Sequence, residues 1–430
     1  MKKCTPVKIL ILGAGGREHA LAWRLANDPD RHDLVISPGN PGLSGLGRLE
    51  PADLLNPDAV VRLAEAERVD LTVVGPEAPL EKGLADRFRA AGRPLLGPSR
   101  EGALLETSKS HAKRFMERLD IPTARFVVCR SAGDALGAVA GDQFGFPVVV
   151  KADGLAAGKG VTVAADRAEA EAAIRTIMVD RQFGAAGDEV VIEECLTGPE
   201  VSMFYLLDGT TAVYLGSAQD HKRIFDDDRG PNTGGMGAFA PSPLVDDALE
   251  RTVRARIVDR VLQGHRDAGE PYIGFLYVSL MLTPRGPYVI EFNVRFGDPE
   301  AQVVLPLIEG DFGDLLKRAA TGRLAGAVVQ RSADVAVGVV LASRGYPASS
   351  ESGVEIRGLE AAKAVSGVIV FHAGTRLDDG RLVTAGGRVL TVVARAADFQ
   401  PAMDAAYRAA DLIEFDGRQM RRDIGRKALV

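Results

Sequence analysis

The sequence predicts an α/β fold with an N-terminal doubly wound parallel-sheet domain, a central domain and a C-terminal α+β domain. Three observations indicate this fold. Residues 7–99 alternate apolar runs with amphipathic stretches, as parallel strands and their crossover helices do. The rest of the chain combines groups of strands with single helices. The length of 430 residues fits about three domains of roughly 150 residues each.

The first part of the chain has the rhythm of a doubly wound sheet. Short apolar runs such as "VKILILG" alternate with longer stretches such as "REHALAWRLAND", whose apolar residues recur at helical spacing. Ligands of such sheets bind at the carboxyl ends of the strands. We expect strands at 7–13, 33–39, 70–77 and 94–99, and helices at 17–28, 56–69 and 84–92.

The turn after the first strand is glycine-rich but lacks a dinucleotide fingerprint. Glu18 occupies the place of the third glycine, and the second strand ends in Ser-Pro-Gly without the acidic residue that binds an adenosine ribose. The amides of Gly15 and Gly16 can still bind a phosphate at the helix start, which favours a sugar phosphate over NAD. The alternative is that these glycines only permit close packing of strand and helix.

The remaining elements follow in order. A helix over 104–120 ends before Pro122, and a strand–helix–strand unit then runs to about residue 198. The next part holds strands and one long helix at 248–264. The C-terminal part holds strands at 335–343, 367–375 and 388–396, and a helix at 399–414.

The stretch "KADGLAAGKG", residues 151–160, is a glycine- and lysine-rich loop between two apolar runs. It fails the Walker pattern, because its glycines are one residue too close and Gly160 replaces the Ser or Thr. The next residues predict a strand, so we expect a hairpin. With Lys151 and Lys159, such a hairpin can close over a triphosphate as a lid. The alternative is a glycine-rich surface turn.

A second motif, "PYVIEFNVRFGDPEAQ", places Glu291 and Asn293 two residues apart on a predicted strand. Side chains two residues apart on a strand point to the same face. A carboxylate and an amide oxygen suit a hard cation such as Mg²⁺. We expect Arg295 on the same face, where it can grip a carboxylate or phosphate. The alternative is a solvated edge strand.

The composition excludes several classes of protein. A net charge of −6 argues against a nucleic-acid surface, and no apolar run approaches the roughly 20 residues of a membrane span. The three cysteines, Cys4, Cys129 and Cys195, are scattered and predict neither a disulfide framework nor a zinc site. We therefore expect a cytoplasmic protein that acts on small molecules, without nucleic acid, membrane or obligate protein partner.

Taken together, the motifs resemble those of the ATP-grasp enzymes and, within them, the glycinamide ribonucleotide synthetase (phosphoribosylamine–glycine ligase) family. The resemblance covers nearly the whole chain and lies in "LILGAGGREHALAW", "GPEAPL", "VVVKADGLAAGKGV", "GPNTGGMGA", "EFNVRFGDPEAQ", "FHAGT" and "GGRVL". Single motifs are shared by many ATP-grasp ligases, whereas their order is specific. The resemblance implies an N-terminal domain over 1–104, an ATP-grasp domain over 105–330 with a lid at about 123–198, and a C-terminal domain over 331–430.

The resemblance also implies a reaction of purine biosynthesis. ATP phosphorylates glycine, and the amine of 5-phosphoribosylamine attacks the glycyl phosphate, which gives glycinamide ribonucleotide, ADP and phosphate. The implied cofactors are ATP and Mg²⁺ or Mn²⁺, with the metal on Glu291 and Asn293. Arg295, Asp298 and Lys151 are implied as catalytic residues.

The implied binding residues form two groups. ATP would contact Lys109, Lys151, Gly154, Gly158, Lys159, Gly160, Glu193, Glu194, Leu196 and Glu200, with the segment 193–196 at the adenine and Glu200 at the ribose. The other substrates would contact Gly15, Gly16, Asn40, Glu77, Asp220 and Lys222.

Four positions depart from the family pattern. Asp227 and Ser279 stand where glycine is usual, and Ser350 and Glu351 replace a more typical tyrosine and lysine. Three alternatives for the function remain open: another purine-pathway or biotin-dependent ATP-grasp enzyme, an NAD-dependent oxidoreductase, and a non-catalytic nucleotide-binding protein.

Overall fold

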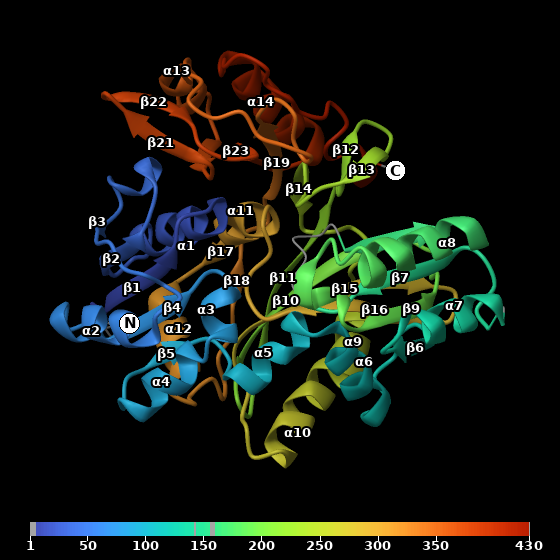
Figure 1. Ribbon diagram of the computed structural model, residues 1–430. Coiled ribbons are helices and arrows are strands. Elements are labelled where there is room, and N and C mark those ends of the chain that lie inside the picture. Colours follow the sequence, from blue (N-terminus) through green and yellow to red (C-terminus); the bar gives the residue numbers. More distant parts are fainter. Residues whose placement is uncertain (1–5, 142, 155–159, 430) are drawn as a thin grey trace.

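The computed structural model describes residues 6–141, 143–154 and 160–429 (Figure 1). Its N-terminal part is a five-stranded sheet in the order β3-β2-β1-β4-β5, and every strand pair in it is parallel. The predicted doubly wound parallel sheet is thus confirmed, and β3 is a further short edge strand. The strands are β1 (Lys8–Gly13), β2 (Asp33–Pro38), β3 (Arg48–Leu49), β4 (Leu71–Val74) and β5 (Leu95–Leu96).

Helices connect these strands, and local sequence fixes where they start. Asn56 caps α2 by accepting a hydrogen bond from the amide of Ala59, and Pro57 occupies the first helical position. The N-terminal helices are α1 (Gly16–Ala26), α2 (Pro57–Ala66), α3 (Ala78–Glu81) and α4 (Leu84–Ala90), with a 3₁₀ turn at Pro41–Leu43.

The helix expected over 104–120 is two helices, α5 (Arg100–Thr107) and α6 (Lys109–Arg118). Ser108 separates them because its backbone is extended, with φ −138° and ψ 109°. Its hydroxyl accepts a hydrogen bond from the amide of His111 and so caps α6. The break places Lys109 in the first turn of a helix that begins beside the lid.

The lid is a four-stranded antiparallel sheet in the order β6-β9-β7-β8. Strands β7 and β8 pair as the predicted hairpin, with Lys151 opposite Val161. Val150, Ile192 and Ile174 are buried in a core of the lid's own. Its elements are β6 (Phe126–Cys129), α7 (Ala132–Ala140), β7 (Val148–Ala152), β8 (Val161–Ala164), α8 (Arg167–Ile174), a π turn at Arg175–Val179, a 3₁₀ turn at Gly184–Gly187 and β9 (Val190–Glu194).

An eight-stranded antiparallel sheet joins the central part of the chain to the C-terminal part. Its order is β16-β15-β10-β11-β14-β19-β23-β20. The pairing of β14 with β19 therefore continues one sheet across both parts. The strands are β10 (Glu200–Asp208), β11 (Ala212–Asp220), β14 (Gly237–Ala240), β15 (Ile273–Thr283), β16 (Gly286–Asn293), β19 (Val335–Ala342), β20 (Val368–His372) and β23 (Arg388–Ala396).

The expected long helix is confirmed as a continuous segment with a π turn in its middle. It consists of α9 (Asp247–Val253), the π turn Arg254–Val258 and α10 (Asp259–Asp267). Two helices that we did not predict, α11 (Glu300–Val304) and α12 (Phe312–Ala320), follow β16. Pro306 and the shortness of α11 hide its helical periodicity, whereas Asp311 caps α12 through the amide of Asp314.

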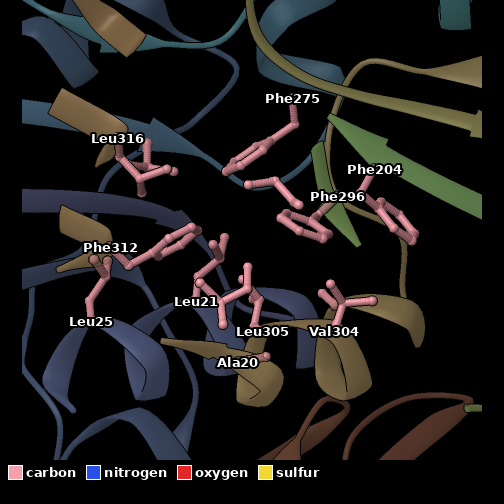
Figure 2. Packing of buried hydrophobic residues seen from close by; sticks show 14 of the residues in the cluster. Ala20, Leu21, Leu25, Phe204, Phe275, Phe296, Val304, Leu305, Phe312 and Leu316 are labelled. Atoms are coloured by element: carbon pink, nitrogen blue, oxygen red, sulfur yellow. The ribbon is translucent and has the colours of Figure 1, made fainter. Parts of the chain in front are cut away.

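Both missed helices lie between the N-terminal sheet and the eight-stranded sheet. Figure 2 shows Phe312 and Leu316 of α12 beside Leu21 and Leu25 of α1. Phe275 of β15 belongs to the same buried cluster. The cluster holds the N-terminal domain against the central one.

The C-terminal part packs α14 (Phe399–Leu412) against β19 and β23, and its strand β20 contacts α1. The amide of His372 on β20 donates to Nδ1 of His19 on α1 at 2.8 Å. A strand of the C-terminal part therefore lies against the first helix of the chain. The remaining elements are α13 (Leu359–Lys363), the 3₁₀ turns Leu305–Leu307 and Arg426–Ala428, and the two-stranded pairs β12 (Arg223–Phe225) with β13 (Arg229–Asn232), β17 (Ile308–Glu309) with β18 (Gln330–Arg331), and β21 (Thr375–Asp378) with β22 (Arg381–Thr384).

Asp227 lies in the turn between β12 and β13 with a φ of 58°. This left-handed region favours glycine but admits aspartate, whose short side chain hydrogen-bonds locally. The amide of Asp227 donates to Asp423 at 3.0 Å, which holds the turn against the C-terminal segment. The departure from glycine at this position therefore keeps the backbone conformation that glycine would supply.

Within the described residues, no helix combines the length and the apolar character that crossing a bilayer requires.

Candidate active site

The two predicted metal ligands lie at the end of β16. Glu291 pairs with Ser279 on β15, and Asn293 pairs with Tyr277. Residues paired across antiparallel strands share a face, and positions two apart do so as well. Glu291 and Asn293 therefore point to the same side of the eight-stranded sheet, as predicted. Ser279, where the family usually has glycine, adds a buried side chain next to Glu291.

The same face carries more acidic residues on the neighbouring strands. Glu200 and Ser202 lie on β10, and Ser202 pairs with Ala218, two residues before Asp220 on β11. Lys222 donates to Glu200 at 2.6 Å. Burial and the nearby Glu300 and Glu200 raise the pKa of Asp220 to about 7, although Lys222 opposes the shift.

This face suits a divalent cation. Carboxylate and amide oxygens are the ligands that Mg²⁺ prefers, and a bound cation would offset the repulsion among the clustered carboxylates. Glu291 and Asn293 thus fit the metal that the resemblance implies.

The lid brings a second charged group to the site. Lys151 on β7 forms an ion pair with Glu193 on β9. Lys113 on α6 forms an ion pair with the other carboxylate oxygen of Glu193. We did not predict Lys113, because a lysine in an amphipathic helix ordinarily faces solvent, whereas this one is 3% exposed.

Lys109 and the start of the glycine loop are joined directly. Lys109 donates to the carbonyl oxygen of Gly154 at 2.8 Å. Asp153, which we also did not predict, accepts from the amide of Ser110 at 2.8 Å and so ties the loop to the N-terminus of α6. Gly160 accepts from the amide of Ala152 at 2.8 Å. Gly158 and Lys159 lie outside the described residues.

The segment expected at the adenine, residues 193–196, begins at Glu193, which is the ion-pair partner of Lys151. Glu194 is held at the surface by Arg125 at 2.9 Å, while Leu196 is half-buried after the end of β9. Because the Glu193 and Glu194 side chains bind lysine and arginine, adenine recognition here would use the backbone. That role stays a prediction, as does ribose binding by Glu200.

Arg295 lies beyond the end of the strand on which we expected it. β16 ends at Asn293, and Arg295 turns toward the N-terminal domain, where it pairs with Glu77 at 3.2 Å and Glu106 at 2.7 Å. Glu106, on α5, was not predicted. Burial disfavours a charged guanidinium, but Glu106 and Glu77 outweigh it and raise the pKa of Arg295. The buried arginine therefore stays charged between two carboxylates.

Asp298 lies where three parts of the chain meet. Gln302 of α11 donates to its carboxylate at 2.7 Å, and Arg388 of β23 donates to its carbonyl oxygen at 2.6 Å. A Cβ atom added to Gly15 would lie 3.6 Å from the Asp298 carboxylate. The structure thus brings the first glycine-rich turn next to a predicted catalytic residue.

The N-terminal glycines and Asn40 have structural partners. The Gly15 amide donates to Glu18 at 2.6 Å, and a Cβ atom added to Gly16 would lie 2.4 Å from Gln302. The Asn40 side-chain amide donates to the carbonyl oxygens of Ala14 and His372. Close packing therefore accounts for part of this glycine-rich pattern, and substrate contacts of these residues stay predictions.

A further cluster of potential metal ligands, Asp28, His32 and Asp311, lies away from this site. The Val7 amide donates to Nδ1 of His32, so Nε2 carries the proton and donates to both carboxylates, at 3.0 and 3.2 Å. This cluster is a hydrogen-bonded tie between α1, the turn after it and the start of α12.

Comparisons with known proteins agree with this architecture. Three family models match the chain in succession: phosphoribosylglycinamide synthetase N domain over residues 7–106, its ATP-grasp (A) domain over 107–301, and its C domain over 336–427.

Curated relatives match over almost the full length. The chain is 48% identical to a phosphoribosylamine–glycine ligase of Phenylobacterium zucineum, over 98% of this chain and 100% of the relative. It is 45% identical to the one of Ralstonia nicotianae, with the same coverage.

Solved structures show the same fold. The crystal structure of phosphoribosylamine–glycine ligase from Thermotoga maritima has a TM-score of 0.86 at 34% identity and covers 97% of this chain and 100% of its own. A biotin carboxylase complex from Campylobacter jejuni has a TM-score of 0.71 at 16% identity, covering 96% and 93%, which is a likeness of fold alone.

Proposed function

This chain belongs to the phosphoribosylglycinamide synthetase family, and we propose that its site joins glycine to 5-phosphoribosylamine with the use of ATP. The protein is an ADP-forming ligase of purine biosynthesis, as its relatives' names indicate. The observation that carries the proposal is the placement of Glu291 and Asn293 on a sheet face rich in carboxylates, in a chain that matches all three family domains.

The proposed reaction has two steps. A carboxylate oxygen of glycine attacks the γ-phosphorus of ATP, and the bond to the β-phosphate oxygen breaks to release ADP. The amine of phosphoribosylamine then attacks the carbonyl carbon of glycyl phosphate. The carbon–oxygen bond breaks, phosphate leaves, and the amine loses one proton as the amide forms.

The charged residues support the first step by position and charge rather than by covalent chemistry. Phosphoryl transfer depends on positioning and on stabilising charge around the transferred group. Lys151, and Lys109 beside the loop that starts at Gly154, supply positive charge from the lid side. Glu291 and Asn293 would hold Mg²⁺ or Mn²⁺, which supplies charge neutralisation at the phosphates when bound. The lid would also exclude water from a hydrolysable acyl phosphate.

The second step fits the junction between the N-terminal and central domains. Asp298 and the Arg295–Glu77 pair lie beside the strand ends of the N-terminal sheet, where ligands of doubly wound sheets bind. Phosphoribosylamine bound at these strand ends would present its amine toward Asp298. Glycine would be activated between that junction and β16, the strand that carries Glu291 and Asn293.

Cys129 and Cys195 are free thiols, which supports the proposed action in a reducing cytoplasm.

The test is ADP release with ATP, Mg²⁺, glycine and phosphoribosylamine generated in situ, with each component omitted in turn. We expect release that requires both glycine and phosphoribosylamine. Release that ignores glycine, or none in the complete mixture, would contradict the proposed substrates and leave only the fold. Because the likeness to biotin carboxylase shows fold alone, bicarbonate in place of glycine serves as the negative control.

A further inference from the structure

A buried charge cluster lies where the lid joins the central domain. It consists of Lys113 on α6, Lys151 on β7 and Glu193 on β9, and none of the three side chains is more than 6% exposed. Each lysine pairs with a different carboxylate oxygen of Glu193. The cluster therefore holds two ammonium groups for one carboxylate. Burial lowers the pKa of Lys113 to about 8, and Lys151 adds to the shift while Glu193 opposes it.

Lys113 also connects this cluster to the strand that carries the proposed metal ligands. Its ammonium group donates to the Thr123 hydroxyl at 2.8 Å, and that hydroxyl donates to the carbonyl oxygen of Val289 at 2.8 Å. Val289 lies on β16, two residues before Glu291. A short chain of hydrogen bonds thus runs from the lid strand β9 to the metal strand.

The two lysines differ in what they can reach. Lys151 lies at the end of β7, next to the glycine loop, whereas Lys113 is fixed between Glu193 and Thr123. When the Lys151 ammonium group turns to a phosphate, its ion pair with Glu193 is lost. A buried carboxylate without a counter-ion is costly, so Lys151 can turn away only if another cation remains at Glu193.

We propose that Lys113 is a positioning residue for ATP: it stays with Glu193 as a fixed counter-ion, so that Lys151 can leave the carboxylate for the phosphates. The inference rests on the proposed function, because it takes Lys151 as a phosphate ligand. Without Lys113, Lys151 would be the only cation on Glu193 among the residues that the structure describes, and it would be held there. The affinity for the phosphates would then fall, while contacts to the nucleoside would not change.

The experiment compares the binding of ATP and of adenosine by calorimetry in the full-length protein. In Lys113→Met, which keeps the apolar stem, we expect ATP affinity to fall about tenfold or more, because residues of one salt-bridge network are coupled by that much. Adenosine affinity should stay within about twofold. Lys363→Met, at an exposed site on α13, is the control and should leave both affinities unchanged.

A double variant separates the charge effect from damage to the lid. In Glu193→Gln there is no carboxylate to neutralise, so adding Lys113→Met should change ATP affinity by no more than about twofold. Lys113→Met alone keeps the buried charges balanced, because Glu193 stays paired with Lys151. The comparison of Glu193→Gln with the double variant does not depend on that single variant, because both proteins leave Lys151 without its carboxylate and differ only at Lys113.

Several results would overturn the inference. One is wild-type ATP affinity in Lys113→Met. Another is an equal loss of ATP and adenosine, which would mean that Lys113 only holds the lid together. A third is a further tenfold loss of ATP affinity when Lys113→Met is added to Glu193→Gln, which would mean that Lys113 acts without the Glu193 carboxylate. A wild-type protein that binds no ATP would instead contradict the proposed function itself.

Discussion

Arg388 on β23 donates one guanidinium nitrogen to the carbonyl oxygens of both Asp298, at 2.6 Å, and Gly234, at 2.5 Å. A residue of the C-terminal part of the chain thereby fixes the backbone at a predicted catalytic residue of the central part. It also fixes Gly234 in the "GPNTGGMGA" motif. The eight-stranded sheet makes this possible, because β23 reaches the site through β19 and β14.

Replacing Arg388 with methionine should therefore impair turnover while ATP binding persists. A shift of Asp298 by about 1 Å is enough to lower kcat by about a hundredfold. The measurement is kcat and KM for glycine and phosphoribosylamine, together with calorimetric ATP affinity. Arg376→Met, in the exposed β21, is the matched control. Normal kcat in Arg388→Met would show that this contact does not position the reacting groups.

Glu291→Gln should remove a charged metal ligand and leave the fold intact. We expect kcat to fall by about a hundredfold, equivalent to about 2.7 kcal/mol, because the metal's neutralisation of phosphate charge is weakened. The Mg²⁺ concentration needed for half-maximal activity should rise as well. Turnover against Mg²⁺ concentration and the thermal midpoint of unfolding check both points. Near-normal activity would make the metal assignment wrong.

Asp28→Ala should destabilise the junction between the N-terminal domain and α12. Asp28 is fully buried and accepts hydrogen bonds from Arg24, His32 and the Gly313 amide. Its removal leaves the buried Arg24 without its counter-ion, which costs about 3 kcal/mol or more. Urea unfolding measures the loss. Asp416→Ala, which removes an exposed pair with Arg344, should change stability little, and equal effects of the two substitutions would contradict the argument.

Stability should fall as the pH decreases below about 6.5, the value at which histidines of the unfolded chain take up protons. Burial lowers the pKa of His19 to about 3 and that of His372 to about 4. Between those values and about 6.5 the unfolded chain binds protons that the folded chain does not, so each histidine lowers the unfolding free energy by about 1.4 kcal/mol per pH unit.

Urea unfolding at about pH 7 and about pH 5.5 measures this slope. His19→Gln should reduce it, because glutamine does not titrate and its side-chain oxygen can accept the His372 amide hydrogen bond. An unchanged slope would mean that His19 does not carry the pH dependence.

The sequence by itself determined the parts of this protein that depend on local pattern. Alternating apolar and amphipathic stretches predicted the parallel sheet, and the glycine-flanked runs around Lys151 predicted the hairpin, because strand pairing between neighbours is a local property. The period of a strand was enough to place Glu291 and Asn293 on one face. That period does not extend to Arg295, because the strand ends at Asn293, two residues earlier.

Only the tertiary structure decided which distant residues share the site. Lys113, Glu106 and Arg388 lie far along the sequence from their partners, which are Glu193, Arg295 and Asp298. Each looks like an ordinary surface charge in its own segment. They become site residues because folding removes them wholly or partly from water, and a charge in such a place must find a partner of opposite sign. Which partner it finds depends on the packing of whole sheets and helices, and no local pattern of the sequence contains that information.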